Sequence, residues 1–349
     1  MFCQDDLPKI LRKEVIASLH DGIVRIHNRK VYPGRDEYVY VSSVQGIADA
    51  MHQMVTQGGG ILRLSLVALL FIAEQMAGGK IPLSPQEFTR LLAVVKDARR
   101  TNTTSHRILD DLTASLVLEG AFSDAERLVA LSRRMVKEVE DSFDAFYDYM
   151  SDLGADLIQD GEGLFTTCFA EHTFILSLLK AYRSGKSLHV YVPETRPYLQ
   201  GARLTAPSLQ QLGIPVTLMS DAMAAHLIQA GLIDRYMSAA DTVCMDGSAA
   251  NKVGTLTNAI LCSHYHLPFH LFAVSPDRTK QSMEDIEIEY RDPQELLMFR
   301  GERISEAGVQ GIYPAFDTIP PSLITSIITP RGVLRPQEIR MKWAAGEEL

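Results

Sequence analysis

The chain has 349 residues, of which 46% are hydrophobic and 22% are charged, so it can bury the cores of two domains of ordinary size. Its formal net charge of -9 excludes the overall basic field that nucleic acid or an anionic membrane requires. An anionic ligand must therefore meet a local cluster of positive groups, which favours a small phosphate over a polyanion.

The N-terminal residues and the cysteines both indicate a cytoplasmic protein. Residues 1–19 include acidic side chains and no long apolar run, which does not fit a secretory signal. The cysteines form no CxxC pair, so we expect reduced thiols at Cys3, Cys168, Cys244 and Cys262. The most apolar stretch, 61–72, is shorter than the roughly 20 residues of a membrane span and carries Arg63, so a buried helix is expected.

The first part of the chain predicts a small sheet followed by helices. Residues 22–41 form two strand-like runs separated by Pro33 and Gly34, which indicates an antiparallel sheet. From Ser42, which can cap a helix, the apolar period becomes helical. Helices are expected at 42–55, after the glycines at 58–60, and at about 84–98, 105–118 and 122–153. We place this N-terminal sheet and helical domain at residues 1–153.

The second part, residues 154–349, alternates between short β-rich runs and helical segments. This βαβ rhythm predicts a mostly parallel, doubly wound sheet, so the fold class is α/β. Neither GxGxxG nor GxxxxGK[ST] occurs, so no nucleotide cofactor is expected. A plain dehydrogenase of Rossmann type would have only the βαβ rhythm in its favour. The polar segment after Arg335 is expected to be loosely held.

Reactive and polar residues follow several of the predicted parallel strands, where ligands bind in open sheets. Cys168 follows 163–167, Asp241 follows 235–240, and the segment 251–255 combines an amide, a cation and a glycine at a predicted helix start. These residue types suit acid/base chemistry and the binding of sugar hydroxyls and phosphate.

Each of these residues also has a structural interpretation. Cys168 can be a small apolar residue that ends a buried strand, and Asp241 can cap a loop. Asn251 can cap a helix beside an exposed Lys252, and the glycines at 58–60 can form a tight turn rather than present amides to phosphate.

A metal site and a serine hydrolase have little support. Cys262, His264 and His266 do not share one helix face, and no second ligand group with zinc-like spacing occurs. The nucleophile pattern GxSxG is absent. No metal is therefore expected.

Four segments closely resemble the methylthioribose-1-phosphate isomerase family. They read VPETRPYLQGARLTAPSLQQLGIPVTLMSDAMAAHLI, AADTVCMDGSAANKVGT, IEIEYRDPQEL and YPAFDTIPPSLITSIITPRGVL. The resemblance implies a homodimer in which an N-terminal domain accompanies a Rossmann-like C-terminal domain. It also implies an aldose-ketose isomerase that acts on a sugar phosphate without a cofactor.

The superfamily also contains ribose-1,5-bisphosphate isomerases and regulatory subunits of a translation initiation exchange factor. The regulatory subunits are not enzymes and lack the catalytic cysteine and aspartate, which match Cys168 and Asp241 here. The resemblance therefore favours an isomerase of a 5-substituted ribose 1-phosphate. A ribose-1,5-bisphosphate isomerase or a sensing subunit is the alternative.

The resemblance also implies substrate-binding positions. Gln200 of LQGAR, Asn251 and Lys252 match such positions, and Arg99 resembles the phosphate-holding arginine of an ARPT segment, although Arg100 replaces the proline.

Two departures from the family pattern concern the substrate. The family's RGA motif becomes Gln57, Gly58 and Gly59, so a phosphate-facing arginine is lost, for which Arg63 can compensate. The family's THCNAG becomes TTCFAE, which places a phenylalanine and a glutamate beside Cys168. These changes favour a shifted substrate, such as 5-deoxyribose 1-phosphate.

Overall fold

The computed structural model describes residues 2–99 and 102–343. The chain forms two compact units, Met1–Ala145 and Phe146–Leu349. The boundary expected after residue 153 falls inside helix α6 (Ala125–Leu157), because this one helix begins in the first unit and ends in the second.

The N-terminal unit contains the expected small antiparallel sheet, with the order β1-β2-β3. Its strands are β1 (Ala17–His20), β2 (Ile23–His27) and β3 (Tyr38–Val41), so the sheet begins before the predicted residue 22. The short helices that precede it are η1 (Gln4–Asp6), η2 (Lys9–Leu11) and α1 (Lys13–Ile16).

The predicted helices of this unit are present. They are α2 (Val44–His52), α3 (Gly59–Ala77), α4 (Pro85–Asp97), α5 (Thr103–Leu118), η3 (Ala121–Ser123) and the first part of α6. Ser43, rather than Ser42, caps α2, because its hydroxyl accepts a hydrogen bond from the Gly46 amide.

Helix α3 is the expected buried helix, and it is longer than the sequence suggested. Among the described residues it alone is long and apolar enough to cross a membrane, but 72% of its most apolar window is buried inside the protein. Its apolar side chains pack into the core of the N-terminal unit.

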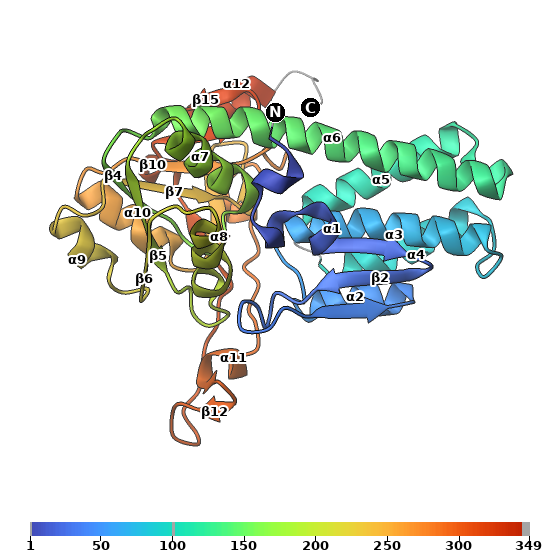
Figure 1. Cartoon of the computed structure of the whole chain (residues 1–349), viewed down its shortest axis with the longest axis horizontal. Coiled ribbons are helices and arrows are strands. Elements are labelled where there is room, and N and C mark those ends of the chain that lie inside the picture. Colours follow the sequence, from blue (N-terminus) through green and yellow to red (C-terminus); the bar gives the residue numbers. More distant parts are fainter. Residues whose placement is uncertain (1, 100–101, 344–349) are drawn as a thin grey trace. The chain divides into compact units, whose positions relative to one another are not determined.

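The C-terminal unit is built on a seven-stranded sheet with the order β15-β14-β10-β7-β4-β5-β6 (Figure 1). The strands are β4 (Glu162–Phe165), β5 (Leu188–Pro193), β6 (Val216–Met219), β7 (Arg235–Ala239), β10 (Phe269–Phe272), β14 (Ser326–Thr329) and β15 (Gly332–Leu334). Only β15 pairs antiparallel with its neighbour. The mostly parallel, doubly wound sheet is thus confirmed.

Helices connect these strands. They are α7 (Glu171–Arg183), the π-helical turn η4 (Gly201–Thr205), α8 (Ala206–Gln211), α9 (Ala224–Gln229) and α10 (Thr255–His264). A separate antiparallel sheet has the order β13-β9-β8 and comprises β8 (Thr242–Val243), β9 (Ala249–Lys252) and β13 (Phe316–Ile319).

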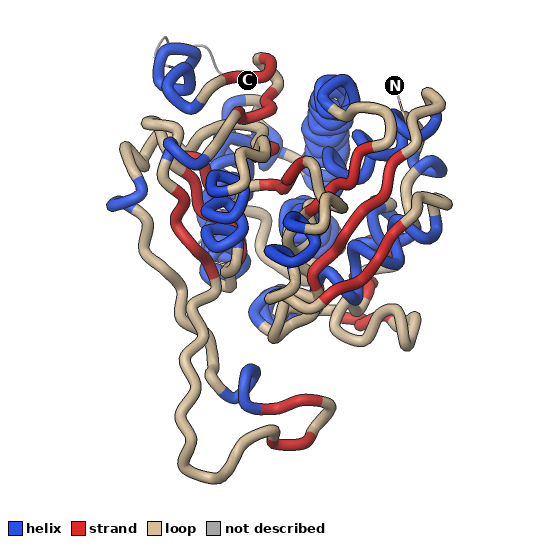
Figure 2. The backbone as a smooth tube through the Cα atoms, turned by 90° about the vertical axis from the view of Figure 1, so that its left-hand side faces the viewer, coloured by secondary structure: helices blue, strands red, loops and turns tan. Residues whose placement is uncertain are grey.

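Between β10 and β13 the chain leads away from the seven-stranded sheet as an arm, which both views show (Figures 1 and 2). It carries η5 (Met283–Asp285), α11 (Gln294–Leu297), β11 (Met298–Phe299) and β12 (Glu302–Arg303). η6 (Pro321–Leu323) follows β13, and η7 (Pro336–Glu338) and α12 (Ile339–Trp343) follow β15. The expectation of a loose tail after Arg335 is wrong for 336–343, because Ile339 and Trp343 are buried in the core.

Candidate active site

The order of the parallel strands reverses between β4 and β7. From β4 the chain builds outward through β5 and β6, and it then returns to build β7, β10 and β14 on the other side. Cys168 follows β4, and Asp241 follows β7. The two residues therefore lie at the point where open α/β sheets bind ligands.

Hydrogen bonds connect the loops that follow β4, β5 and β6. The Cys168 amide donates to Thr195 Oγ1 (3.1 Å), and Thr205 Oγ1 donates to the Cys168 carbonyl (2.5 Å). The Asp221 carboxylate accepts from the amides of Thr195 (2.7 Å) and Arg196 (2.8 Å). Asp221 therefore holds the loop that in turn positions Cys168.

The same loops contain unusual backbone conformations. Four of the eight described non-glycine residues with positive φ lie here: Cys168 (63°), Glu171 (51°), Thr195 (61°) and Leu199 (67°). Left-handed backbone is costly for L-residues and clusters at functional sites. This concentration is consistent with a rigid site around Cys168.

The LQGAR motif packs tightly behind β5. Gln200 is buried and immediately precedes the π-helical turn, a rare conformation that is frequent at functional sites. A Cβ atom on Gly201 would lie 1.8 Å from the Pro193 carbonyl oxygen, so only glycine allows this approach. The close contact holds Gln200 next to the end of β5.

Asn251 and Lys252 lie in strand β9, not at the helix start that the sequence suggested. Helix α10 begins at Thr255, after Gly254 in a left-handed conformation (φ 101°). Asn251 Nδ2 donates to Ser238 Oγ (3.1 Å) and to Thr255 Oγ1 (3.0 Å), which fixes the amide between β7 and the first residue of α10.

Lys252 is buried, which excludes the alternative of an exposed lysine beside a helix cap. Its ammonium lies 5.0 Å from the centre of the Phe316 ring and 5.9 Å from the centre of the Tyr313 ring. Strands β9 and β13 set this arrangement, because Lys252 and Phe316 are paired in register.

Charged groups from distant parts of the sequence meet at Cys168. Burial raises the pKa of the Cys168 thiol to about 11; the Lys252 charge acts against this shift, and Asp241 and Glu171 add to it. Burial also lowers the pKa of Lys252, whereas Cys168 and Asp241 act to raise it. Cys168 is partly buried and Asp241 is exposed. The thiol is therefore protonated at neutral pH, and it lies beside the Lys252 amine and an accessible carboxyl group.

Three further residues surround Lys252 that the sequence did not indicate as site residues: Glu289, Arg291 and Tyr313. Arg291 and Glu289 act on the pKa of Lys252, and Cys168 acts on that of Tyr313. The one available signal was their position in or beside two of the family-like segments, IEIEYRDPQEL and YPAFDTIPP.

The glycines and Arg99 lie in the N-terminal unit. Gly58 is the N-cap of α3, with φ 59°, and Gly59 is the first residue of that helix. Arg99 follows α4, and its Nη1 contacts Met54 Sδ. Arg100, which replaces the family's proline, lies outside the described residues. Phosphate binding by Gly58, Gly59 and Arg99 stays a prediction.

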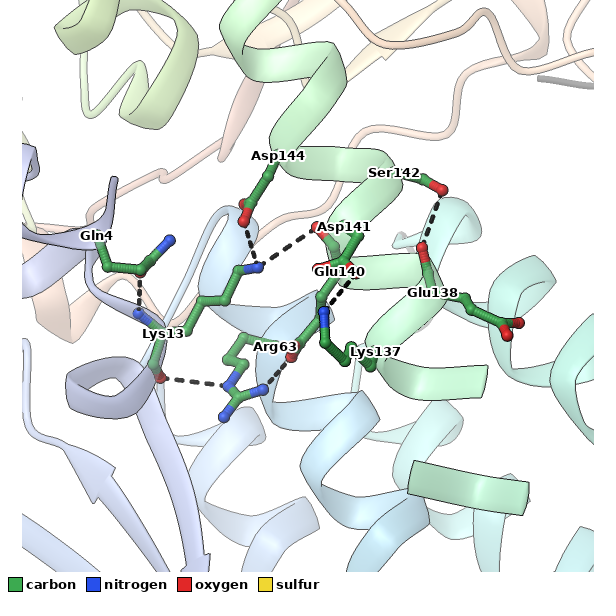
Figure 3. Close-up of polar contacts among 9 residues, drawn as sticks. All are labelled: Gln4, Lys13, Arg63, Lys137, Glu138, Glu140, Asp141, Ser142 and Asp144. Atoms are coloured by element: carbon green, nitrogen blue, oxygen red, sulfur yellow. Dashed lines mark hydrogen bonds and ion pairs between the residues drawn. The ribbon is translucent and has the colours of Figure 1, made fainter. Parts of the chain in front are cut away.

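Arg63 is held by polar contacts within the N-terminal unit (Figure 3). Its Nε donates to the carbonyl oxygens of Lys13 (3.2 Å) and Ala17 (3.0 Å), and its Nη1 pairs with Glu140. Lys13 pairs with Asp144 on the same helix, α6 (2.6 Å). The role of Arg63 as a substitute phosphate ligand also stays a prediction, and it would require Arg63 to exchange Glu140 for phosphate.

The structure gives the metal hypothesis no geometric basis. Cys262 is buried inside α10, whereas His264 and His266 are exposed. Within residues 2–99 and 102–343, no group of three His, Cys, Asp or Glu side chains is placed to hold a metal ion.

Comparisons with known proteins agree with the fold. Residues 72–336 match the model of the Initiation factor 2 subunit family. A methylthioribose-1-phosphate isomerase of Thermus thermophilus is 34% identical over 320 residues, which cover 90% of this chain and 92% of that protein. The chain belongs to the Initiation factor 2 subunit family and, within it, to the methylthioribose-1-phosphate isomerase family.

Further relatives extend the comparison. A methylthioribose-1-phosphate isomerase of Acetivibrio thermocellus is 31% identical, with 90% of this chain and 95% of that protein covered. The crystal structure of the 5-methylthioribose 1-phosphate isomerase from Pyrococcus horikoshii has a TM-score of 0.81 at 27% identity, covering 98% of this chain and 97% of that one. The delta subunit of translation initiation factor eIF-2B from A. fulgidus has a TM-score of 0.76 at 25% identity, with coverages of 93% and 96%.

Proposed function

We propose that this chain is an aldose-ketose isomerase that converts a 5-substituted ribose 1-phosphate to the corresponding ribulose 1-phosphate. One observation carries the proposal: Cys168, Asp241 and Lys252 come within electrostatic reach of one another at the switch point of the sheet. The isomerase names of relatives that match about nine-tenths of the chain support it.

The reaction requires one proton donor and one proton acceptor. The C1–O4 bond breaks and the ring oxygen gains a proton, a hydrogen moves from C2 to C1, and the C2 hydroxyl loses its proton to become a ketone. The phosphate stays on C1 throughout. General acid/base catalysis by two positioned side chains is suited to this sequence of steps.

In the proposed mechanism, Asp241 exchanges a proton with the ring oxygen or a hydroxyl. Cys168 either stabilises the charge that develops at C2, since a protonated thiol can donate a hydrogen bond, or it shuttles the C2 proton after passing its own proton to the ring oxygen. Lys252, with Gln200 and Asn251, holds the substrate. No metal or nucleotide takes part.

Substitution of the two catalytic residues tests this proposal. Cys168→Ser and Asp241→Asn should each lose several orders of magnitude in turnover while keeping the melting temperature of the wild type. Near-native turnover in either folded variant would refute that residue's role. Turnover in deuterium oxide separates the routes, since solvent deuterium at C1 of the product indicates an enediol.

The group at C5 of the sugar distinguishes three candidate substrates. The relatives are named for 5-methylthioribose 1-phosphate, whereas Phe169 and Glu171 beside Cys168 favour a shifted substrate such as 5-deoxyribose 1-phosphate. Ribose 1,5-bisphosphate is the third candidate. Proton NMR of the anomeric signal, with each compound separately and without added metal or nucleotide, would identify the preferred substrate from the relative rates.

A sensing or regulatory subunit is the second candidate, because an eIF-2B delta subunit shares the fold. Such a subunit would bind a sugar phosphate or nucleotide without turnover and would tolerate replacement of Cys168. We further propose that the protein is cytoplasmic and that it forms a homodimer. Sedimentation of the purified chain would test the dimer.

A further inference from the structure

Two buried polar atoms close to Lys252, Arg291 Nη1 and Tyr313 Oη, make no hydrogen bond of ordinary geometry in the described chain, although the two side chains lie within reach of each other. The Arg291 side chain is 7% exposed and Tyr313 is 3% exposed. An unsatisfied buried donor is costly, and such a group in a native structure requires an explanation.

The backbone holds these two side chains in place. The Arg291 amide donates to the Tyr313 carbonyl (2.9 Å), and the Ala315 amide donates to the Glu289 carbonyl (2.8 Å). Arg291 Nε also donates to Glu289 Oε1 (3.0 Å). Glu289 therefore occupies one edge of the guanidinium and leaves Nη1 unpaired.

Two basic side chains and two carboxyl groups lie around these atoms. Arg291 and Lys252 are two basic side chains that lie close together, and the Arg291 charge acts to lower the pKa of Lys252. In the described chain, the Lys252 ammonium is faced by the Tyr313 and Phe316 rings, with Asp241 and Glu289 within electrostatic reach. Two like charges that are buried side by side are stabilised when an opposite charge lies between them.

We propose that Arg291 and Tyr313 bind the phosphate of the substrate together with Lys252. This inference rests on the proposed function and assigns a further role within the same site. A phosphate monoester dianion has three oxygens that accept hydrogen bonds, and arginine is well suited to them. Arg291 would thus bring a cation to the phosphate from within the C-terminal unit, whereas Arg63 of the N-terminal unit is paired with Glu140.

The first assay measures the Kd of inorganic phosphate for the whole chain by calorimetry. The second assay measures KM and kcat for 5-methylthioribose 1-phosphate and 5-deoxyribose 1-phosphate. Arg291→Gln should raise both the Kd for phosphate and KM by about 10- to 100-fold, because it removes a charge-assisted hydrogen bond. Arg291→Lys should recover part of the loss. Arg300→Gln, the same change at an exposed arginine of the arm, is the matched control and should change neither value.

Tyr313→Phe is the second variant, because it keeps the ring beside Lys252 and removes only the hydroxyl. Tyr313→Phe should raise KM several-fold at unchanged melting temperature. If Arg291→Gln does not fold, Tyr313→Phe alone tests whether this pair of side chains binds the phosphate. Wild-type values of Kd and KM in the folded variants would overturn the assignment. If phosphate binding depends on Arg291 but the wild type converts no sugar phosphate, the phosphate site stands and the proposed isomerase function fails.

Discussion

Cys168 should react with alkylating reagents much more slowly than an ordinary cysteine. Burial raises the pKa of its thiol from the usual 9.0 to about 11. At pH 7 the reactive thiolate then makes up about 1 in 10,000 molecules, compared with about 1 in 100 for an unshifted thiol. Alkylation should therefore be about 100-fold slower, and it should accelerate about tenfold for each pH unit up to pH 10.

The assay is iodoacetamide labelling between pH 6 and 10, with each cysteine followed as a separate peptide by mass spectrometry. The exposed Cys3 gives the labelling rate of an accessible thiol for comparison. The buried Cys244 and Cys262 become labelled only if the chain unfolds. Asp241→Asn should speed labelling of Cys168 by removing a negative charge, and Lys252→Met should slow it by removing a positive one. An apparent pKa of 8 or below would refute the reasoning, and Cys168 would then act as a thiolate.

Three further predictions concern stability. Glu162→Ala should lower the free energy of unfolding by about 3–5 kcal/mol, because it strands the buried Arg235 guanidinium, which Glu162 binds through two hydrogen bonds of 2.9 and 2.7 Å. Burial lowers the pKa of His270 from 6.5 to about 4, so the folded chain holds this imidazole neutral while the unfolded chain protonates it below pH 6.5. The free energy of unfolding should therefore be unaffected by this group above pH 6.5 and should fall by about 3 kcal/mol as the pH falls to 4. Gly201→Ala should cost about 1–3 kcal/mol, because its Cβ atom would overlap the Pro193 carbonyl.

Urea unfolding measures all three effects, and each has a control. Glu87→Ala breaks an exposed pair with Arg90 and should leave the free energy of unfolding nearly unchanged, because exposed ion pairs contribute little. Gly34→Ala adds a Cβ at 3.6 Å from its nearest neighbour and should be tolerated. His270→Gln should flatten the pH dependence between 4 and 6.5. Equal losses in variant and control, or an unchanged pH dependence without His270, would contradict the respective arguments.

Local patterns in the sequence determined the elements and the fold class of this protein. Alternating residues at 22–41 predicted a sheet, and the βαβ rhythm after 160 predicted the parallel sheet, because side-chain periodicity reflects which face is buried. Cys168 and Asp241 were also accessible to sequence reasoning, since both directly follow predicted strands whose carboxyl ends must share one edge.

Only the tertiary structure decided which groups stand beside Cys168 and which cations are already paired. Lys252 looked like an exposed residue at a helix start, but pairing of β9 with β13, more than 60 residues further along the chain, buries it against Tyr313 and Phe316. Arg63 was expected to be able to compensate for a lost phosphate-facing arginine, but α6 brings Glu140 to it. Both outcomes depend on contacts between residues far apart in the sequence, which neither periodicity nor local motifs contain.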